Sequence, residues 1–462
     1  MSGVTRLLAA GLATAPLCLP SVARAQTDST NLLGPIWGLR PWLGQYGVSL
    51  GLSEISELFG NATGGMHQGA AYDGLTEMSV GIDLGRAIGL PGGTINASAL
   101  QIHGRSLSAD NLDNFDTISG IEADRATRLW ELWYDQQFAD GAVDLKLGQQ
   151  SLDQEYITSA NLSVFANTMF GWPALPSYDL YAGGPAYPLA SPGIRLRGTA
   201  GPWTALAGVY DDNPAGGRFN DDPQTADASG ARFNLDTAAL FIAEIDFAPG
   251  APALGDTTTN PNTPSAPAAL PSLYKLGAWF DTASFPDQRS DDQGLPLASP
   301  LSSGRSRLLR HDVSVYGVAD QMIWRPDPAG PRALNLFARL MGAPGDRNLV
   351  DFSANLGLVL KAPLPGRDND TLGFAGGLTR IGRYALDYDR DVQRLDPGSY
   401  APLRSAESYL ELTYQYQATG WLLIQPDLQY IFMPGAGIAN PDEPDTRIAN
   451  EFVLGVRTGI VF

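Results

Sequence analysis

The sequence has few of the residues that build metal, disulfide or catalytic sites. Its 462 residues include a single cysteine, Cys18, and three histidines. Cys18 lies near the start of the chain, so the rest of the chain has no disulfide and no thiolate ligand. His67, His103 and His311 have no spacing that resembles a metal-binding motif. We therefore expect no metal and no cofactor.

Basic residues and long apolar runs are also scarce. The chain has 30 basic residues against 49 acidic ones, which gives a net charge of −19. A surface that binds phosphates needs the opposite balance, so nucleic acid is excluded as a partner. Beyond residue 25, no stretch of 18 or more apolar residues occurs, and this excludes a conventional transmembrane helix.

The first residues are typical of an export signal. Arg6 precedes the apolar run 7–19, and Ala23 and Ala25 supply the small residues that a signal peptidase reads. We expect a signal peptide over residues 1–25, which contains Cys18. A periplasmic segment over 26–46 and a membrane-embedded body over 47–462 should follow.

The last residues alternate between apolar and small or charged side chains. This period of two is that of a strand, and a strand with lipid on one side and water on the other needs only alternate apolar residues. A terminal aromatic, Phe462, is typical of the closing strand of an outer-membrane barrel and should be read by the barrel-assembly machinery. The predicted lipid face includes Leu145, Leu412 and Phe462, and the predicted lumen face includes Asp144, Glu411 and Arg457.

The whole chain can be divided into alternating segments separated by Gly, Pro and Asp. An even number of strands brings both termini to one side of the membrane. The fold class we predict is therefore all-β, a transmembrane antiparallel barrel of about sixteen strands, although alternation alone does not exclude fourteen or eighteen. The predicted strands are 47–58, 71–86, 93–104, 125–138, 142–150, 192–200, 203–211, 234–248, 272–283, 311–326, 332–342, 350–363, 370–382, 405–418, 421–433 and 448–462.

The connections between these strands alternate in length. Those that follow odd-numbered strands are mostly long and polar, and the others are mostly short, as expected for external loops and periplasmic turns. The segment 249–271 is the exception and should be a long, irregular periplasmic connection. In strand 125–138 we expect Trp130, Leu132 and Tyr134 to face lipid, with Glu131, Trp133 and Asp135 facing the lumen.

Five segments, taken in order, carry a family resemblance: Leu32 to Leu43, Ser98 to Arg105, Leu129 to Tyr134, Leu147 to Gln150 and Asn167 to Pro173. Together they resemble the OprB-type carbohydrate-selective porins. The resemblance extends over essentially the whole chain after the signal, although Pro35 and Ile36 depart from the family's usual opening. It implies a sugar channel with an arginine and a glutamate at its constriction.

Sugar passage requires hydrogen-bonding groups and flat apolar faces, because a sugar has many hydroxyls and no net charge. Arg105 follows the predicted strand 93–104 and Glu131 points inward from the next strand, so we expect them to face each other at the constriction; the alternative is a lumenal salt bridge that only structures the wall. The segment 151–191 is rich in aromatic residues and should fold into the barrel, with Trp172 or a nearby tyrosine as a stacking plane; the alternative is that its rings anchor the barrel rim. Further candidates on lumenal positions are Lys146, Arg195, Arg197 and Arg339.

The function we predict is passive diffusion of monosaccharides such as glucose across the outer membrane. The alternative is a non-selective or ion-preferring porin, and a surface receptor also remains open. An enzyme is not expected, because the G-x-S-x-G match at Gly47 to Gly51 falls within a predicted strand rather than at a strand–helix turn. The expected partners are sugar solutes, membrane lipid and lipopolysaccharide, and the sequence leaves open whether barrels associate as homotrimers.

Overall fold

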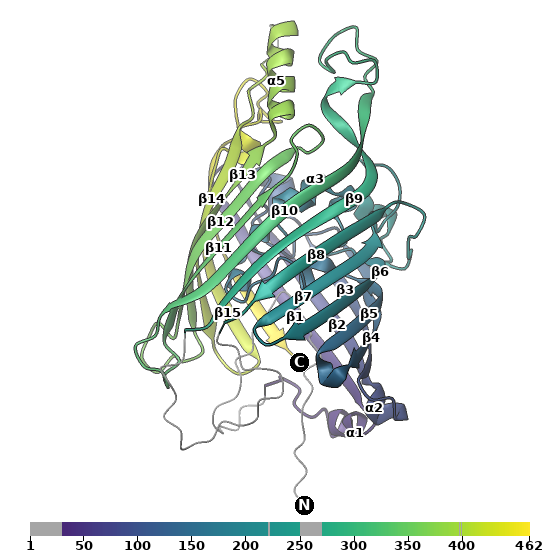
Figure 1. Ribbon diagram of the computed structural model, residues 1–462. Coiled ribbons are helices and arrows are strands. Elements are labelled where there is room, and N and C mark those ends of the chain that lie inside the picture. The colour runs from purple at the N-terminus through teal and green to yellow at the C-terminus, as the bar shows by residue number, and fades with distance from the viewer. Residues whose placement is uncertain (1–29, 220–221, 250–269, 397, 399) are drawn as a thin grey trace, which may run out of the picture.

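The computed structural model describes residues 30–219, 222–249, 270–396, 398 and 400–462. Within them, sixteen antiparallel strands form one closed barrel in which each strand pairs with its neighbours in sequence and β1 pairs with β16 (Figure 1). The strands are β1 (Val48–Gly65), β2 (Gly69–Asp83), β3 (Gly93–Gly104), β4 (Ala126–Phe138), β5 (Val143–Gln150), β6 (Ser191–Ala200), β7 (Trp203–Asp211), β8 (Ala239–Phe247), β9 (Ser272–Asp291), β10 (Ser306–Trp324), β11 (Ala333–Gly342), β12 (Val350–Lys361), β13 (Thr371–Ile381), β14 (Ala406–Gln417), β15 (Leu422–Phe432) and β16 (Ala449–Val461).

The strand count and the order of the predicted strands are confirmed. Closure of the sheet leaves no free edge around the barrel, so the backbone N–H and C=O groups within the closed part of the sheet are paired on both sides. The helices in the described residues belong to the connections and not to the sheet: α1 (Leu39–Gln45), α2 (Leu84–Ile88), α3 (Ala174–Asp179), which lies inside the barrel, α4 (Pro223–Ala226) and α5 (Arg383–Leu395). None of them is long and apolar enough to cross a membrane.

The two faces of the strands follow the predicted alternation. Leu412 is exposed on the outer face, whereas Glu411 beside it is buried in the lumen. Arg457 lies inside the barrel and pairs with Glu57 across the β1–β16 seam that closes the sheet. The outer face is therefore apolar where lipid would contact it, and the inner face is polar.

The two ends of the barrel differ. One end has short turns and carries α1, α2 and the C-terminus, and the other carries α5 and a tall hairpin (Figure 1). That hairpin extends β9 and β10 over much of the segment 284–310, which we expected to be loop. Residues 383–395, also expected to be loop, form the helix α5. The predicted signal peptide over 1–25 and most of the connection 249–271 lie outside the described residues.

The alternation along β14 has a direct energetic consequence. An arginine at position 412 would face lipid, which costs about 2–4 kcal/mol near the middle of the bilayer. We expect Leu412→Arg to reduce the folded fraction in a heat-modifiability gel. Leu301→Arg is the matched control, because Leu301 is 81% exposed on the tall hairpin and faces water. Equal folding of the two variants would contradict the assignment of the outer face.

Candidate functional site: the lumen and its inward loop

The connection between β5 and β6, residues 151–190, lies inside the barrel. Carboxylates on the wall accept hydrogen bonds from its backbone N–H groups at successive points along the loop. Glu131 of β4 binds the N–H of Ser151 at 3.0 Å, and Glu244 of β8 binds the N–H of Ile157 at 2.8 Å. Charged acceptors make stronger hydrogen bonds than neutral ones, so these contacts hold an otherwise irregular segment.

The far side of the barrel binds the same loop. Asp320 of β10 accepts from the N–H of Asn161 at 3.3 Å. Glu411 of β14 accepts from the N–H groups of Ala166 and Asn167 at 2.6 and 3.1 Å. The contacted residues lie on β4, β8, β10 and β14, so the loop crosses the lumen instead of following one side of it.

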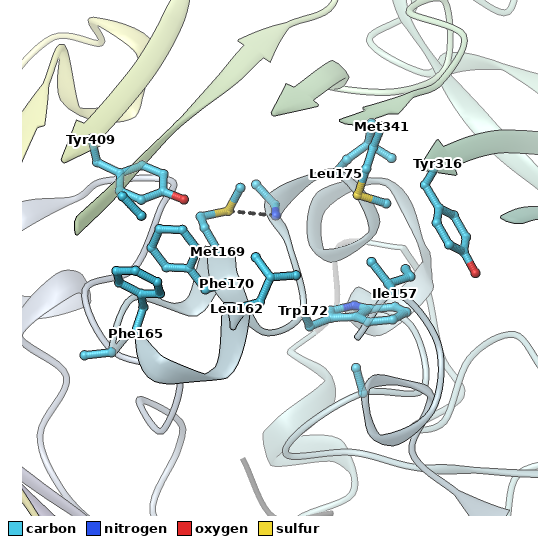
Figure 2. Close-up of a cluster of buried hydrophobic side chains, with 14 of the residues drawn as sticks. Ile157, Leu162, Phe165, Met169, Phe170, Trp172, Leu175, Tyr316, Met341 and Tyr409 are labelled. Carbon is cyan, nitrogen blue, oxygen red and sulfur yellow. Dashed lines mark hydrogen bonds between the residues drawn. The ribbon is translucent and has the colours of Figure 1, made fainter. Parts of the chain in front are cut away.

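Aromatic packing supports the loop from within (Figure 2). The ring centroids of Phe165 and Phe170 are 4.4 Å apart, and Phe170 also contacts Tyr409 of β14 at 5.5 Å. Phe337 of β11 contacts both loop rings edge-on at 5.6 and 6.0 Å. These rings therefore form a small apolar core between loop and wall, where water would otherwise fill the lumen.

A second segment also enters the barrel. The connection between β3 and β4, which we expected to be an external loop, buries Leu107, Leu112 and Ile118 completely or almost completely. Glu407 of β14 accepts from the N–H groups of Phe115 and Asp116 at 2.9 and 2.7 Å. The pattern of a wall carboxylate that binds loop N–H groups thus occurs for both inward segments.

A cavity of about 430 Å³ lies between the inward loop and the wall. Its wall residues come from strands on opposite sides of the barrel, for example Ile55 of β1, Leu273 of β9 and Gly459 of β16. Aromatic rings contribute a large part of its lining: Trp130, Phe165, Phe170, Trp172 and Tyr187.

The cavity lining also offers charged and neutral polar groups. Lys275 and Arg457 supply positive charge, and Asp246 supplies negative charge from the neighbouring strand. Lys275 is itself paired with Glu244 at 2.8 Å and lies 3.6 Å from Asp246. Gln415 and Gln425 add amides, each of which donates to the backbone oxygen of Val164 in the loop. Opposite charges and amides in so small a space favour a neutral solute with many hydroxyls.

Asp153 adds a carboxyl to the cavity from the loop itself. It accepts from the Ser151 hydroxyl at 2.6 Å and from the N–H of Tyr187 at 3.2 Å, and so joins the two ends of the loop. Burial raises the pKa of the Asp153 carboxyl above its ordinary value, and these hydrogen bonds oppose that shift.

A β-bulge in β4 changes the predicted direction of one side chain. Ala97 pairs with Leu132 and Ala99 pairs with Leu129, so Trp130 and Glu131 both lie opposite Ser98. Two residues facing one is the geometry of a bulge, and it turns both side chains inward. The prediction that Trp130 faces lipid is therefore wrong: it is 3% exposed and contacts Tyr187 edge-on at 6.2 Å.

The predicted contact between Arg105 and Glu131 is not formed. Arg105 lies just beyond the end of β3, is 56% exposed, and contacts Asp110 and the backbone oxygen of Ala70. Glu131 lies opposite Ser98, seven residues further down β3, which at about 3.3 Å per residue is more than 20 Å away. Alternation indicates which face a side chain occupies, but it does not give its depth along the barrel axis.

The predicted basic residues all belong to the wall and are already paired. Arg195 is buried against Asp135, Asp144 and Glu155, and Arg197 also binds Asp144. Lys146 pairs with Glu155 and lies 4.6 Å from the Trp133 ring. Arg339 donates to Asn355 and to the backbone oxygens of Met169 and Gly171, so it anchors the loop.

Of the seven predicted site residues, Trp172 is the one that lines the cavity. Its ring nitrogen donates to the backbone oxygen of Gly183 at 2.8 Å, which fixes the ring within the loop. The sequence analysis missed Lys275 and Gln425 as candidate site residues. Alternation assigns many residues to the lumen face, and only the position of the loop distinguishes these two from the others. In the described residues, no group of three or more His, Cys, Asp or Glu side chains is placed to hold a metal.

Comparison with known proteins identifies the barrel. A family model described as "Carbohydrate-selective porin, OprB family" matches residues 67–462. The chain belongs to the OprB family of carbohydrate-selective porins. It is therefore a channel protein of the outer membrane and not an enzyme.

Individual relatives agree with this assignment. Porin B of Pseudomonas aeruginosa is 27% identical over 94% of this chain and 92% of its own length. A putative porin, QuiX, of Acinetobacter baylyi is 24% identical over 90% and 91%. The fold is shared with a high-pH structure of Pseudomonas putida OprB, at a TM-score of 0.81 and 22% identity over 95% of this chain and 99% of that one.

The carboxylate contacts predict how the inward loop is held. Glu411→Gln keeps the size of the side chain but replaces one acceptor oxygen with an NH₂ group, which cannot bind a backbone N–H. Since hydrogen bonds to charged groups contribute about 1.5–3 kcal/mol each, the loop should be held less firmly. We expect larger fluctuations and a higher mean in single-channel conductance. Glu443→Gln, at an exposed acid, is the control, and identical traces from both variants would show that Glu411 does not hold the loop.

Proposed function

We propose that this porin conducts monosaccharides such as glucose down their gradient, and that the cavity beside the inward loop is the selective step. The observation that carries the proposal is the lining of that cavity, where aromatic rings lie beside amides and both signs of charge. Its volume of about 430 Å³ is at the small end of ligand sites, which run from about 300 to 1,000 Å³. This size favours one sugar ring over a longer oligosaccharide.

Trp172 provides the apolar part of sugar recognition in this proposal. A pyranose ring has a flat C–H face that can lie on an indole. Trp172 is held by the loop and Trp130 by the bulge, so neither ring must be ordered when a sugar arrives. A pre-ordered surface lowers the entropic cost of binding without requiring tight contacts.

Hydroxyl exchange provides the polar part. Lys275 and Arg457 donate, and the carboxylate of Asp246 accepts, so a hydroxyl can replace its lost water at either kind of group. Each of these charges has a protein partner, which limits how strongly it holds a solute. Passive transport requires such weak binding, because a sugar must leave the site as readily as it enters.

Trp172→Leu tests the stacking surface. We expect glucose block of the ion current to weaken by about tenfold, equivalent to about 1.4 kcal/mol, with the barrel still folded. The measurement is single-channel conductance in planar bilayers with glucose titrated into the bath. Trp324→Leu is the control, because Trp324 is exposed at the end of β10.

The outcomes separate this proposal from its alternative. A wild-type current that does not respond to glucose would indicate a non-selective or ion-preferring porin. Glucose block that is retained in Trp172→Leu would show that recognition lies elsewhere in the lumen. Arg105→Ala should keep wild-type block, because Arg105 lies on the rim and does not line the cavity.

A further inference from the structure

The ion pairs of α5 and the tall hairpin share one asymmetry, because the arginine is more exposed than the acid it binds. Arg307 of the hairpin is 49% exposed, whereas its partner Asp287 is fully buried. The other pairs of this sector follow the same order: Arg289 with Asp391, Arg380 with Asp351, Arg383 and Arg390 with Asp387, Arg394 with Asp391, and Arg404 with Asp389. This sector therefore presents arginine to its surroundings, although the chain as a whole is acidic.

Exposed pairs on the far side of the same end lack this asymmetry. Arg105 and Asp110, beyond β3, are both exposed. His67, beyond β1, and its partner Asp442 are exposed to the same degree. Acids at that side offset the bases beside them, so the positive surface belongs to the sector of α5 and the hairpin, which rise from one end of the barrel (Figure 1).

Arg310 of β10 points away from the pore. Its neighbour Leu309 pairs with Phe285, which is fully buried and contacts Tyr181 of the inward loop. Successive side chains of a strand point to opposite faces, so Arg310 lies on the outer face. It is exposed and forms no ion pair within the described residues. Arg347 donates to its backbone oxygen at 2.8 Å and so fixes the strand at this point.

Arg380 and Arg383 continue the same rim. Thr379 donates a hydrogen bond to Asp116 of an inward segment, so the next residue of β13, Arg380, faces outward. Its guanidinium carbon lies 5.3 Å from the ring centroid of Phe352, with which it pairs across the strands. Arg383 begins α5 just beyond β13 and is 84% exposed. The rim thus extends from β10 to the start of α5.

This rim lies at the level of the lipid headgroups. Phe280 and Phe352 are on the outer face near the same end, and outward aromatic rings of this kind mark the membrane interface. Arg310 lies beyond Phe280 along the hairpin, and Arg380 lies beside Phe352. The outward residues below the rings are apolar and well exposed, as acyl chains require: Val315, Leu340 and Leu356.

We propose that the rim formed by Arg310, Arg380 and Arg383 binds the phosphate groups of lipopolysaccharide in the outer leaflet. A guanidinium offers a rigid fork of N–H donors that matches a phosphate. β10 and β13 are three strands apart, about 14 Å, which suits a headgroup with more than one phosphate. The disaccharide headgroup of lipopolysaccharide carries a phosphate at each end, and its acyl chains would lie on the apolar wall below.

The position of the rim separates this ligand from two others. A solute on its way through the pore does not meet these side chains, because Arg310 and Arg380 point outward from the wall. A phospholipid with one phosphate engages only part of a rim that extends over several strands. A glycolipid with several phosphates uses all of it and therefore binds most tightly.

A triple variant tests the proposal. Arg310→Gln, Arg380→Gln and Arg383→Gln together remove three positive charges and leave side chains that still form hydrogen bonds. Folded porin in detergent, freed of lipid, is titrated with lipid A, the phosphorylated glycolipid portion of lipopolysaccharide, and the bound lipid is measured by native mass spectrometry. We expect lipid A to bind the variant at least tenfold more weakly than the wild type. The heat-modifiability gel should show the same folded fraction for both.

A matched triple variant controls for net charge. Arg105→Gln, Arg125→Gln and Arg232→Gln remove three exposed arginines from the same end of the barrel, on the side of β3, β4 and β8. Lipid A should bind this variant with wild-type affinity. An equal loss in both triple variants would show attraction by net charge alone and would overturn the proposal, as would wild-type affinity in the first variant.

Two further lipids test the chemistry of the ligand. Lipid A without its phosphates and phosphatidylglycerol, which has one phosphate, should each bind the wild type at least tenfold more weakly than lipid A. Equal binding of either lipid would overturn the assignment to the phosphates of lipopolysaccharide. Arg310→Gln alone keeps the test valid if the triple variant fails to fold, because Arg310 forms no ion pair within the described residues. We expect it to weaken lipid A binding about threefold, and an unchanged affinity would exclude Arg310 from the site.

Discussion

The hydrogen bond between a wall carboxylate and a loop backbone N–H is the interaction on which this pore depends. A barrel of sixteen strands is wider than its side chains can fill, so its lumen would be an open aqueous channel without the inward segments. Those segments have little regular structure with which to pair their own N–H groups. Glu131, Glu244, Asp320, Glu407 and Glu411 provide the missing acceptors from the wall.

This use of carboxylates accounts for part of the chain's acidic composition. A lumen acid that binds two backbone N–H groups needs no cationic partner, as Glu411 and Glu407 show. Arginines are used in the complementary way, since Arg339 and Arg457 donate to loop carbonyls. The inward loop is thus held through both its donors and its acceptors. Because these charged wall residues bind groups of the inward segments, a narrow cavity lined by charged residues can still accept a neutral solute.

Much of the fold could be predicted from the sequence, because the period of two reports directly on the lipid and lumen faces. The strands that were predicted least well are those whose ends depend on contacts beyond the membrane. β9 and β10 continue into a tall hairpin, and α5 forms where only a polar loop was expected. Lipid imposes no pattern on these segments, so alternation carries no information about them.

The site was less predictable than the fold for three physical reasons. Alternation does not measure depth, and so Arg105 was paired with a glutamate far below it. A bulge adds one residue and reverses the local parity, and so Trp130 was assigned to lipid. The sequence does not show which protein group a charged lumen residue binds. Arg195 and Arg339 were therefore predicted to contact solute, although both are buried and bind other protein groups. Trp172 was found because an aromatic residue in a long Gly- and Pro-rich loop needs an apolar environment, whatever the register of the strands.

A firmly held loop has a consequence for the rate of transport. If closure of the lumen depended on a mobile segment, each sugar would wait for that segment to move, and a loop that opens slowly would limit flux. Here the loop contacts walls on several sides of the barrel through charge-assisted bonds and a packed group of aromatic rings. The constriction is therefore a permanent part of the wall, and in the proposed function selectivity comes from the surface it presents to the solute. A solute that exchanges its water for these fixed groups can cross at a rate set by diffusion and by weak binding.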